Sequence, residues 1–329
     1  MKTPSFWYKD KPDFMARLLS PLGALYQWAD RYNYNRTDAR RAPLPVLCVG
    51  NINAGGSGKT PTVVALFKLL QDYQLAKAPA FLLRGYHSRV VGPCYVEEAA
   101  TSDQWGDEAV LLSDIGPTIV AQSRYDGACL AARCGQDIVV LDDGLQHYDL
   151  AKDISFCVVD GAHGFGNGLA LPSRPLRVTF EDAIPAIDAF IVIGDPTHSS
   201  CSMIFSSGKP VFRAALRPTN LSELSLDQPY FGFCGIGLPQ KFKSSLQDCG
   251  VKLVGFESFA DHHAYSFDDL AALGKKATAL GARLITTSKD AVRLVDFPQK
   301  SLVDELKVSL VWEDQIAVVD FIRGRLSAS

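Results

Sequence analysis

The first segment that could do chemistry is glycine-rich and ends in Lys59-Thr60. A short apolar run, 45–50, precedes it, and an amphipathic stretch follows at once. A strand, a glycine loop and a helix in that order are the context in which Gly-Lys-Thr marks a phosphate-binding P-loop. Glycines let backbone N–H groups wrap an anion, the lysine reaches the outer phosphates, and the threonine hydroxyl binds magnesium. The sequence therefore predicts a nucleoside triphosphate site; a glycine-rich turn that binds nothing is the alternative.

The loop departs from the strict P-loop pattern at its first position. Asn53 stands where the pattern has glycine, six residues before Lys59. Asparagine tolerates a positive φ better than other non-glycine residues, so we expect the backbone course to be kept. Ala54 stands where one branch of P-loop ATPases has a second lysine, which excludes that branch.

Two acidic pairs are candidates for metal or proton chemistry. The apolar run 138–141 ends in Asp142-Asp143, and a carboxylate at such a strand end holds magnesium together with the P-loop hydroxyl in P-loop enzymes. Asp142 is the first candidate and Asp143 the second. The other pair, Asp107-Glu108, starts an apolar helical run. Taken alone, that fragment favours helix capping over a role in orienting a nucleophile or binding metal.

Histidines and arginines supply the remaining candidates. His262 and His263 follow a predicted strand directly after Asp261. Adjacent histidines do not easily share one metal, whereas a histidine near a carboxylate suits proton abstraction from an alcohol. Arg124 and Arg177 lie beside predicted strand ends, where arginine suits an anionic substrate, although solvated arginines are commoner.

The elements that must position these residues alternate between strand and helix. Apolar runs at 80–84, 119–122 and 154–159 are separated by helical patterns such as 60–72. This alternation predicts an α/β fold with a doubly wound, mostly parallel sheet and ligands at the carboxyl ends of its strands. The pattern restarts near residue 220 after a polar, turn-prone connector. We therefore expect a P-loop domain over 42–219 and a smaller α/β domain over 220–329.

Composition narrows the class of protein. The chain has 329 residues, 47% hydrophobic and 21% charged, with a net charge of −3, which gives no reason to expect nucleic acid as a partner. Eight cysteines without a Cys-x-x-Cys pair indicate free thiols in a reducing compartment. No apolar run approaches the ~20 residues that span a bilayer, and no secretory leader is recognisable.

The N-terminal segment 1–41 differs from the rest. It mixes aromatic residues and leucines with a basic excess, a composition suited to the interface of a membrane. A helix packed on the first domain explains the same composition equally well.

Taken in order, these segments resemble the tetraacyldisaccharide 4'-kinase family of lipid A biosynthesis. The similarity covers most of the chain and begins in the aromatic, basic N-terminus. The motifs that carry it are Val49-Gly-Asn-Ile-Asn-Ala-Gly-Gly-Ser-Gly-Lys-Thr-Pro61, Arg84-Gly-Tyr86, Gly106-Asp-Glu108, Leu141-Asp-Asp-Gly-Leu-Gln-His147, Phe233-Cys-Gly-Ile-Gly237, Phe259-Ala-Asp-His-His263 and Thr287-Ser-Lys-Asp-Ala-Val292. Only the P-loop is diagnostic by itself, but the order of the motifs is specific.

The resemblance implies a kinase that uses ATP and Mg²⁺ to phosphorylate a glycolipid at the cytoplasmic face of the bacterial inner membrane. It implies a peripheral, monotopic attachment through segment 1–41, and no protein partner. It also reverses the capping interpretation, because the family's acidic pair corresponds to Asp107 and Glu108. An aspartate and a histidine from opposite domains act together as the base in that family, which corresponds here to Asp107 and His262, with His263 as the alternative histidine.

The remaining roles are implied in the same way. ATP would bind Asn53, Ala54, Gly55, Gly56, Ser57, Gly58, Lys59 and Thr60; Mg²⁺ would bind Thr60, Asp142 and Glu108; substrate or supporting contacts would come from Asp143, Gln146, His147, Arg124 and Arg177. This chain departs from the family pattern at Leu145, Ala109, His87 and Val178. Val178 replaces a common acid, so the partner of the neighbouring Arg177 is open. A P-loop GTPase or metallochaperone-type switch is the alternative function, but Ser288-Lys-Asp290 lacks the asparagine and spacing of the guanine-reading motif.

Overall fold

The structure is a computed structural model that describes residues 37–53, 56–86, 88–98, 100–166, 176–294 and 297–328, with single positions between 14 and 36. Most of the predicted membrane-interface segment 1–41 therefore lies outside the described residues, as do Ala54, Gly55 and His87. No described helix is long and apolar enough to cross a membrane.

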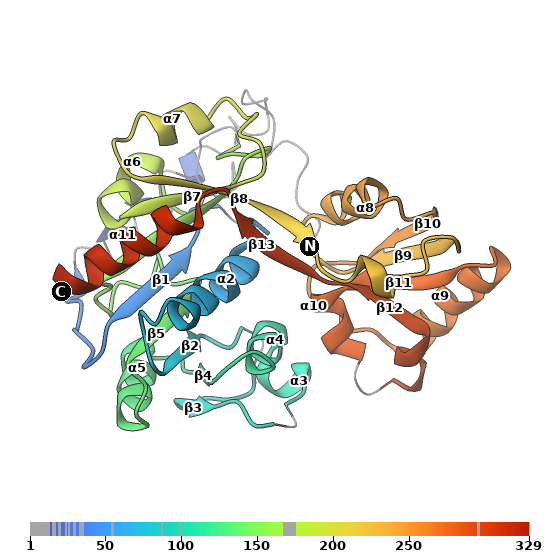
Figure 1. The fold of residues 1–329 in the computed structure, drawn as a ribbon, viewed down its shortest axis with the longest axis horizontal. Helices are drawn as coiled ribbons and strands as arrows, with labels where there is room; N and C mark the ends of the chain where they lie inside the picture. Colours follow the sequence, from blue (N-terminus) through green and yellow to red (C-terminus); the bar gives the residue numbers. More distant parts are fainter. Residues whose placement is uncertain are drawn as a thin grey trace.

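A nine-stranded sheet forms the larger part of the molecule, in the order β13-β8-β7-β6-β1-β5-β2-β4-β3 (Figure 1). Its strands are β1 (Val46–Gly50), β2 (Pro79–Leu83), β3 (Cys94–Tyr95), β4 (Thr118–Val120), β5 (Ile138–Asp142), β6 (Ile154–Asp160), β7 (Ala189–Ile193), β8 (Val211–Pro218) and β13 (Val308–Trp312). The strands from β8 to β4 pair in parallel, and β13 and β3 pair antiparallel at the two edges. The predicted doubly wound α/β fold is confirmed.

Helices cover both faces of this sheet, which explains why its central strands are mostly apolar and buried. Every residue of β1 is buried. One face packs against α2 (Lys59–Asp72), α4 (Asp107–Ser113) and α11 (Gln315–Ala328), and α3 (Ser102–Trp105) adds Trp105 to that core. The other face packs against α5 (Arg124–Arg133), α6 (Phe180–Ala183) and α7 (Cys201–Phe205).

A second, four-stranded sheet has the order β10-β9-β11-β12 and lies beside the first (Figure 1). All its pairs are parallel. It consists of β9 (Tyr230–Cys234), β10 (Leu253–Ser258), β11 (Arg283–Thr287) and β12 (Val303–Leu306). The amphipathic helix α8 (Pro239–Asp248) packs on one face, and α9 (Phe267–Ala279) packs on the other. The short helix α10 (Ser288–Ala291) follows β11 directly.

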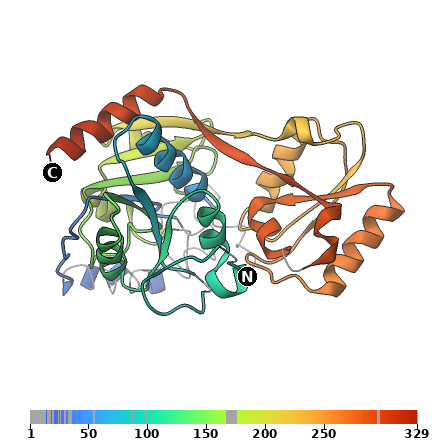
Figure 2. The same ribbon diagram turned by 60° about the horizontal axis from the view of Figure 1, so that its bottom comes forward.

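The end of the chain returns to the large sheet, which corrects the predicted boundary 220–329. β13 pairs with β8, and the buried residues Val318, Val319 and Ile322 of α11 join the core of the large sheet. The smaller sheet is therefore an insertion between β8 and β13, and these two strands run side by side toward it (Figure 2). Pattern alone could not show this, because a short apolar strand at 308–312 fits either sheet.

Candidate active site

The glycine loop leads from β1 into α2, as predicted. Gly58, at φ 89°, is the N-cap of α2, so Lys59 and Thr60 occupy the first helical turn. Asn53 does not adopt the positive φ that we expected, because the described non-glycine residues with positive φ are Gln74, Asp143 and His262. Instead, Asn53 bridges to Leu176 and its amide donates to the Gly164 carbonyl at 2.6 Å. Its side chain therefore ties the start of the loop to the segment after β6.

Lys59 is held among polar groups at the mouth of this loop. Its ammonium donates to Asn51 Oδ1 at 3.2 Å and lies 3.7 Å from Asp143 Oδ1. Burial lowers its pKa, and the nearby Asp143 carboxylate partly offsets that effect. Asn51 also donates to Ser57 at 2.8 Å. We did not predict a role for Asn51. Its position directly after β1 and before the glycine loop was the feature of the sequence that could have indicated one.

The strand-end pair Asp142-Asp143 faces the P-loop but its two members differ. Burial raises the pKa of Asp142 to about 7 despite the nearby Lys59, and its Oδ1 has no hydrogen-bond partner among the described residues. Asp143, at φ 52°, accepts hydrogen bonds from Arg177 at both of its carboxylate oxygens, at 3.0 and 3.1 Å. Arg177 therefore has a carboxylate partner, which answers the question raised by Val178.

Asp107 and His262 come together from the two sheets. Gly106 precedes Asp107 at φ 88°, where a Cβ would lie 2.5 Å from the Tyr86 carbonyl oxygen, so only glycine fits at the start of α4. His262 Nδ1 lies 2.9 Å from Asp107 Oδ2, and this hydrogen bond raises the pKa of His262. His263 instead lies 3.1 Å from Asp269 and stacks on Phe259.

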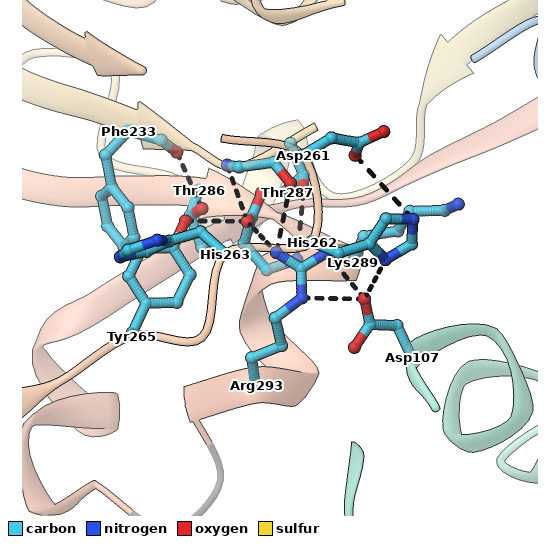
Figure 3. A network of polar contacts seen from close by, with 12 residues as sticks. Asp107, Phe233, Asp261, His262, His263, Tyr265, Thr286, Thr287, Lys289 and Arg293 are labelled. Carbon is cyan, nitrogen blue, oxygen red and sulfur yellow. Dashed lines mark hydrogen bonds and ion pairs between the residues drawn. The ribbon is translucent and has the colours of Figure 1, made fainter. Parts of the chain in front are cut away.

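Two basic residues that we did not predict also cross to the acidic pair. Arg293 contacts Asp107 Oδ2 through Nε at 2.8 Å and through its second terminal nitrogen at 2.7 Å (Figure 3). Lys289 donates to Glu108 Oε1 at 2.7 Å. Burial would raise the pKa of both acids, but the bonds from His262 and Arg293 to Asp107, and the Lys289 charge beside Glu108, outweigh it and lower both pKa values.

The remaining predicted supporting residues make two separate sets of polar contacts. Gln146 donates to the Asn51 carbonyl at 2.8 Å and accepts weakly from Arg177. Arg124 lies 2.6 Å from His147 Nε2. Burial lowers the pKa of Arg124 to about 10 and that of His147 to about 4, so this pair keeps its positive charge on the arginine.

A cleft of about 2050 Å³ separates the two sheets and joins these groups. Its lining includes the described P-loop residues 56–60, the carboxylates of Glu108, Asp142 and Asp143, the imidazole of His262, and the basic residues Lys289 and Lys241. Helix α8 and the facing segments of β8 and β13 line the same cleft. Such a volume accommodates a nucleotide together with part of a second substrate.

The donor set of the cleft fits magnesium bound together with phosphates. Among the described residues no group of three or more His, Cys, Asp or Glu side chains could hold a metal alone. Mg²⁺ at phosphoryl-transfer sites needs only one or two carboxylates, because phosphate oxygens and waters complete its shell. The buried Asp142 Oδ1, without a partner among those residues, is an oxygen of the required kind.

A P-loop at the carboxyl edge of a parallel sheet, facing a strand-end carboxylate and an aspartate–histidine pair, defines a P-loop kinase. The family model for tetraacyldisaccharide-1-P 4'-kinase (LpxK) matches residues 15–327. The tetraacyldisaccharide 4'-kinase of Methylobacterium sp. strain 4-46 is 42% identical over 100% of this chain and 98% of its own length. That of Paramagnetospirillum magneticum is 41% identical over 95% of both chains. The chain belongs to the tetraacyldisaccharide 4'-kinase family.

A solved structure supports the fold. The crystal structure of LpxK from Aquifex aeolicus, described as a complex with ATP, superposes with a TM-score of 0.73 at 24% identity, covering 95% of this chain and 99% of that one. The arrangement of two α/β sheets is therefore shared with a P-loop kinase.

Proposed function

We propose that this chain transfers the γ-phosphoryl group of ATP to the 4'-hydroxyl of a tetraacylated glucosamine disaccharide 1-phosphate, a step of lipid A biosynthesis. The family membership supports the reaction. The observation that supports it in this chain's own residues is the 2.9 Å contact between Asp107 and His262, because His262 lines the same cleft as the P-loop. A GTPase-type switch would not need such a pair.

In this proposal the P-loop residues 53–60 bind the phosphates of ATP, with Lys59 balancing their charge. Thr60, Asp142 and Glu108 would hold Mg²⁺, which would neutralise charge on the transferring phosphoryl group. Asp143, Gln146, His147, Arg124 and Arg177 support the loop and the acceptor. Positioning and electrostatic stabilisation provide most of the acceleration in this class of reaction.

Asp107 acts as the general base toward the sugar hydroxyl. All its contacts from His262 and Arg293 go to Oδ2, and among the described residues no hydrogen bond reaches Oδ1. Oδ1 can therefore accept the hydroxyl proton as the oxygen attacks. His262 keeps the carboxylate oriented through Nδ1.

The proposed activity is tested with the purified chain, labelled ATP, Mg²⁺ and a tetraacyldisaccharide 1-phosphate in mixed micelles. We expect a labelled bisphosphorylated glycolipid that is absent when the acceptor is omitted. An acceptor already phosphorylated at the 4'-position is the control. Hydrolysis of ATP without labelled lipid would reject the proposed acceptor.

We further propose that segment 1–41 attaches the protein to the cytoplasmic face of the inner membrane. At its described positions Phe14, Leu18, Leu22, Leu25 and Trp28 are between 54% and 78% exposed. Apolar side chains on such a basic segment suit insertion among anionic headgroups.

Deletion of residues 1–28 should therefore weaken binding to anionic phospholipid vesicles, measured by co-sedimentation. A variant with serine at Phe14, Leu18 and Leu22 keeps the basic residues and separates insertion from charge. Unchanged sedimentation of the deleted protein would reject the attachment.

A further inference from the structure

Arg293 lies where the smaller sheet meets the acidic pair of the larger one. It belongs to the 3-10 turn Val292–Leu294 that follows α10, and its side chain is 6% exposed. Two of its nitrogens contact the same oxygen of Asp107, and its third nitrogen donates to the Gly235 carbonyl at 3.1 Å and to Asp290 at 2.9 Å. The guanidinium therefore joins the proposed base to the interior of the smaller sheet.

The far side of Arg293 is fixed by a fully buried carboxylate. Asp290 is 0% exposed and accepts the Gly235 N–H and the Tyr265 hydroxyl, both at 2.8 Å. Its other oxygen accepts the Thr287 hydroxyl at 2.6 Å. Figure 3 shows this network running from the ends of the strands to Arg293 and on to Asp107. A carboxylate satisfied in this way is a rigid support for the arginine.

Arg293 and His262 together leave Asp107 little freedom. Both bind Oδ2, from two different segments of the smaller sheet, so rotation of the carboxylate would break contacts to both. The neighbouring Lys289 is engaged with Glu108 at 2.7 Å and does not duplicate the arginine. A planar guanidinium fixes a carboxylate through several N–H groups, whereas an ammonium acts as a point charge.

We propose that Arg293, supported by Asp290, is a positioning residue that aligns the Asp107 carboxylate for proton transfer when the smaller sheet closes over the P-loop. This inference rests on the proposed function, because Arg293 would influence the rate of phosphoryl transfer only by orienting Asp107, the proposed general base. It predicts that the contribution of Arg293 disappears once Asp107 is removed. A residue that merely stabilises the fold would keep its effect in that background.

The test is a double-mutant cycle on the full chain with ATP and the glycolipid acceptor. Arg293→Ala should lower kcat by about 10²-fold, since misplacing a catalytic group by ~1 Å costs that much, while the KM for ATP changes little. Asp107→Ala/Arg293→Ala should have the same kcat as Asp107→Ala alone. Arg293→Lys keeps the positive charge but loses the planar guanidinium with its several N–H donors. Its kcat should therefore lie between that of Arg293→Ala and that of the wild type. Added guanidinium should partly restore Arg293→Ala and leave Asp107→Ala unchanged.

Arg283→Ala is the matched control. Arg283 forms a two-point pair with Asp304, at 2.7 and 2.9 Å, within the same sheet and away from Asp107, so its loss should leave kcat unchanged. The inference would be overturned if the double variant lost kcat by the product of the two single-variant factors. A wild-type kcat in Arg293→Lys would overturn it as well. If Arg293→Ala does not fold, the lysine variant takes its place. The effect of Arg293→Lys on kcat should then disappear in the Asp107→Ala background. An inactive wild-type chain would instead reject the proposed function.

Discussion

At the scale of single residues, the proposed proton transfer depends on Asp107. Its carboxylate accepts from His262 and Arg293 through one oxygen, which keeps it ionised, while the P-loop proposed to bind ATP lies on a different element. Asp107→Ala should therefore lower kcat by about 10² to 10⁴, the usual contribution of a general base, and leave the Kd for ATP unchanged. Steady-state kinetics and a nucleotide-binding titration check this, with Arg283→Ala as the control. Turnover near that of the wild type would remove Asp107 from the mechanism.

Asp160 provides a pH-dependent contribution to stability. It is 5% exposed, pairs with Lys241 of α8 and lies 3.0 Å from His163. Burial would raise its pKa, but the bonds from His163 and Lys241 outweigh it and hold the pKa far below its usual value. The stabilisation is therefore fully present above the unfolded pKa, near 4, and is lost as the pH falls toward the folded pKa.

Asp160→Asn should lower the free energy of unfolding by about 2 kcal/mol at pH 7, because the charge-assisted hydrogen bonds of a buried carboxylate are weakened. The difference from the wild type should shrink at pH 3.5. Urea denaturation at the two pH values measures it, and Asp320→Asn, in an exposed pair with Arg323, is the control. An equal difference at both pH values would contradict the assignment.

The residues predicted the local parts of the site, the family resemblance supplied the pairing of Asp107 with His262 across the two domains, and the basic residues that also cross were missed. The P-loop and the Asp142-Asp143 strand end are short contiguous segments whose residue types indicate phosphate and metal binding. The structure places them together in the cleft. Arg293 and Lys289 could not be found in this way, because 186 and 181 residues separate them from the acids they contact. Their types are ordinary for surface positions, and only the closed arrangement of the two sheets gives them partners.

At the scale of elements, the start of α4 decides where the acidic pair lies. Gly106 has φ 88° and its Cβ would meet the Tyr86 carbonyl oxygen at 2.5 Å, whereas Gly135 has φ 85° and open space around it. Both positions have a positive φ that strains an alanine, but Gly106, at ψ 153°, lies in a region that is almost reserved for glycine and also adds a backbone clash.

Gly106→Ala should therefore shift the first turn of α4 and reduce kcat by about 10²-fold, as a small displacement of a catalytic group does. Gly135→Ala should lower stability only by the strain of its positive φ, about 1 to 2 kcal/mol, and leave kcat at the wild-type level. Thermal unfolding and kinase kinetics on both variants separate the two effects. Equal kcat values in the two alanine variants would show that the clash is relieved without moving Asp107.

The elements also show why the boundary at 220–329 was wrong. β13 and α11 follow the smaller sheet in sequence, but β13 pairs antiparallel with β8, and Phe321 of α11 packs against Phe156 and Phe212 of the large sheet. A short apolar strand carries no mark of the sheet it will join. The sheet that β13 joins is determined by its antiparallel pairing with β8, which the local sequence does not reveal.

At the scale of the whole molecule, the smaller sheet is attached through β8 and β13 and faces the larger sheet with charged contacts. Arg293 meets Asp107, Lys289 meets Glu108, and Lys241 meets Asp160 at another part of the cleft. Charged contacts can separate without exposing a large apolar surface. This composition suits two domains that close over substrates and open again, which excludes water during transfer.

Reversal of one of these charges should open the molecule. Lys241→Glu places a carboxylate against the buried Asp160, so we expect a larger radius of gyration by small-angle X-ray scattering and a higher KM for ATP, because α8 lines the nucleotide cleft. The exchanged pair Asp160→Lys/Lys241→Glu restores opposite charges and should recover part of both values. A wild-type radius of gyration in Lys241→Glu would show that the Lys241–Asp160 contact does not hold the two sheets together. If the exchanged pair has the same enlarged radius as Lys241→Glu, the effect comes from the packing of α8 rather than from charge.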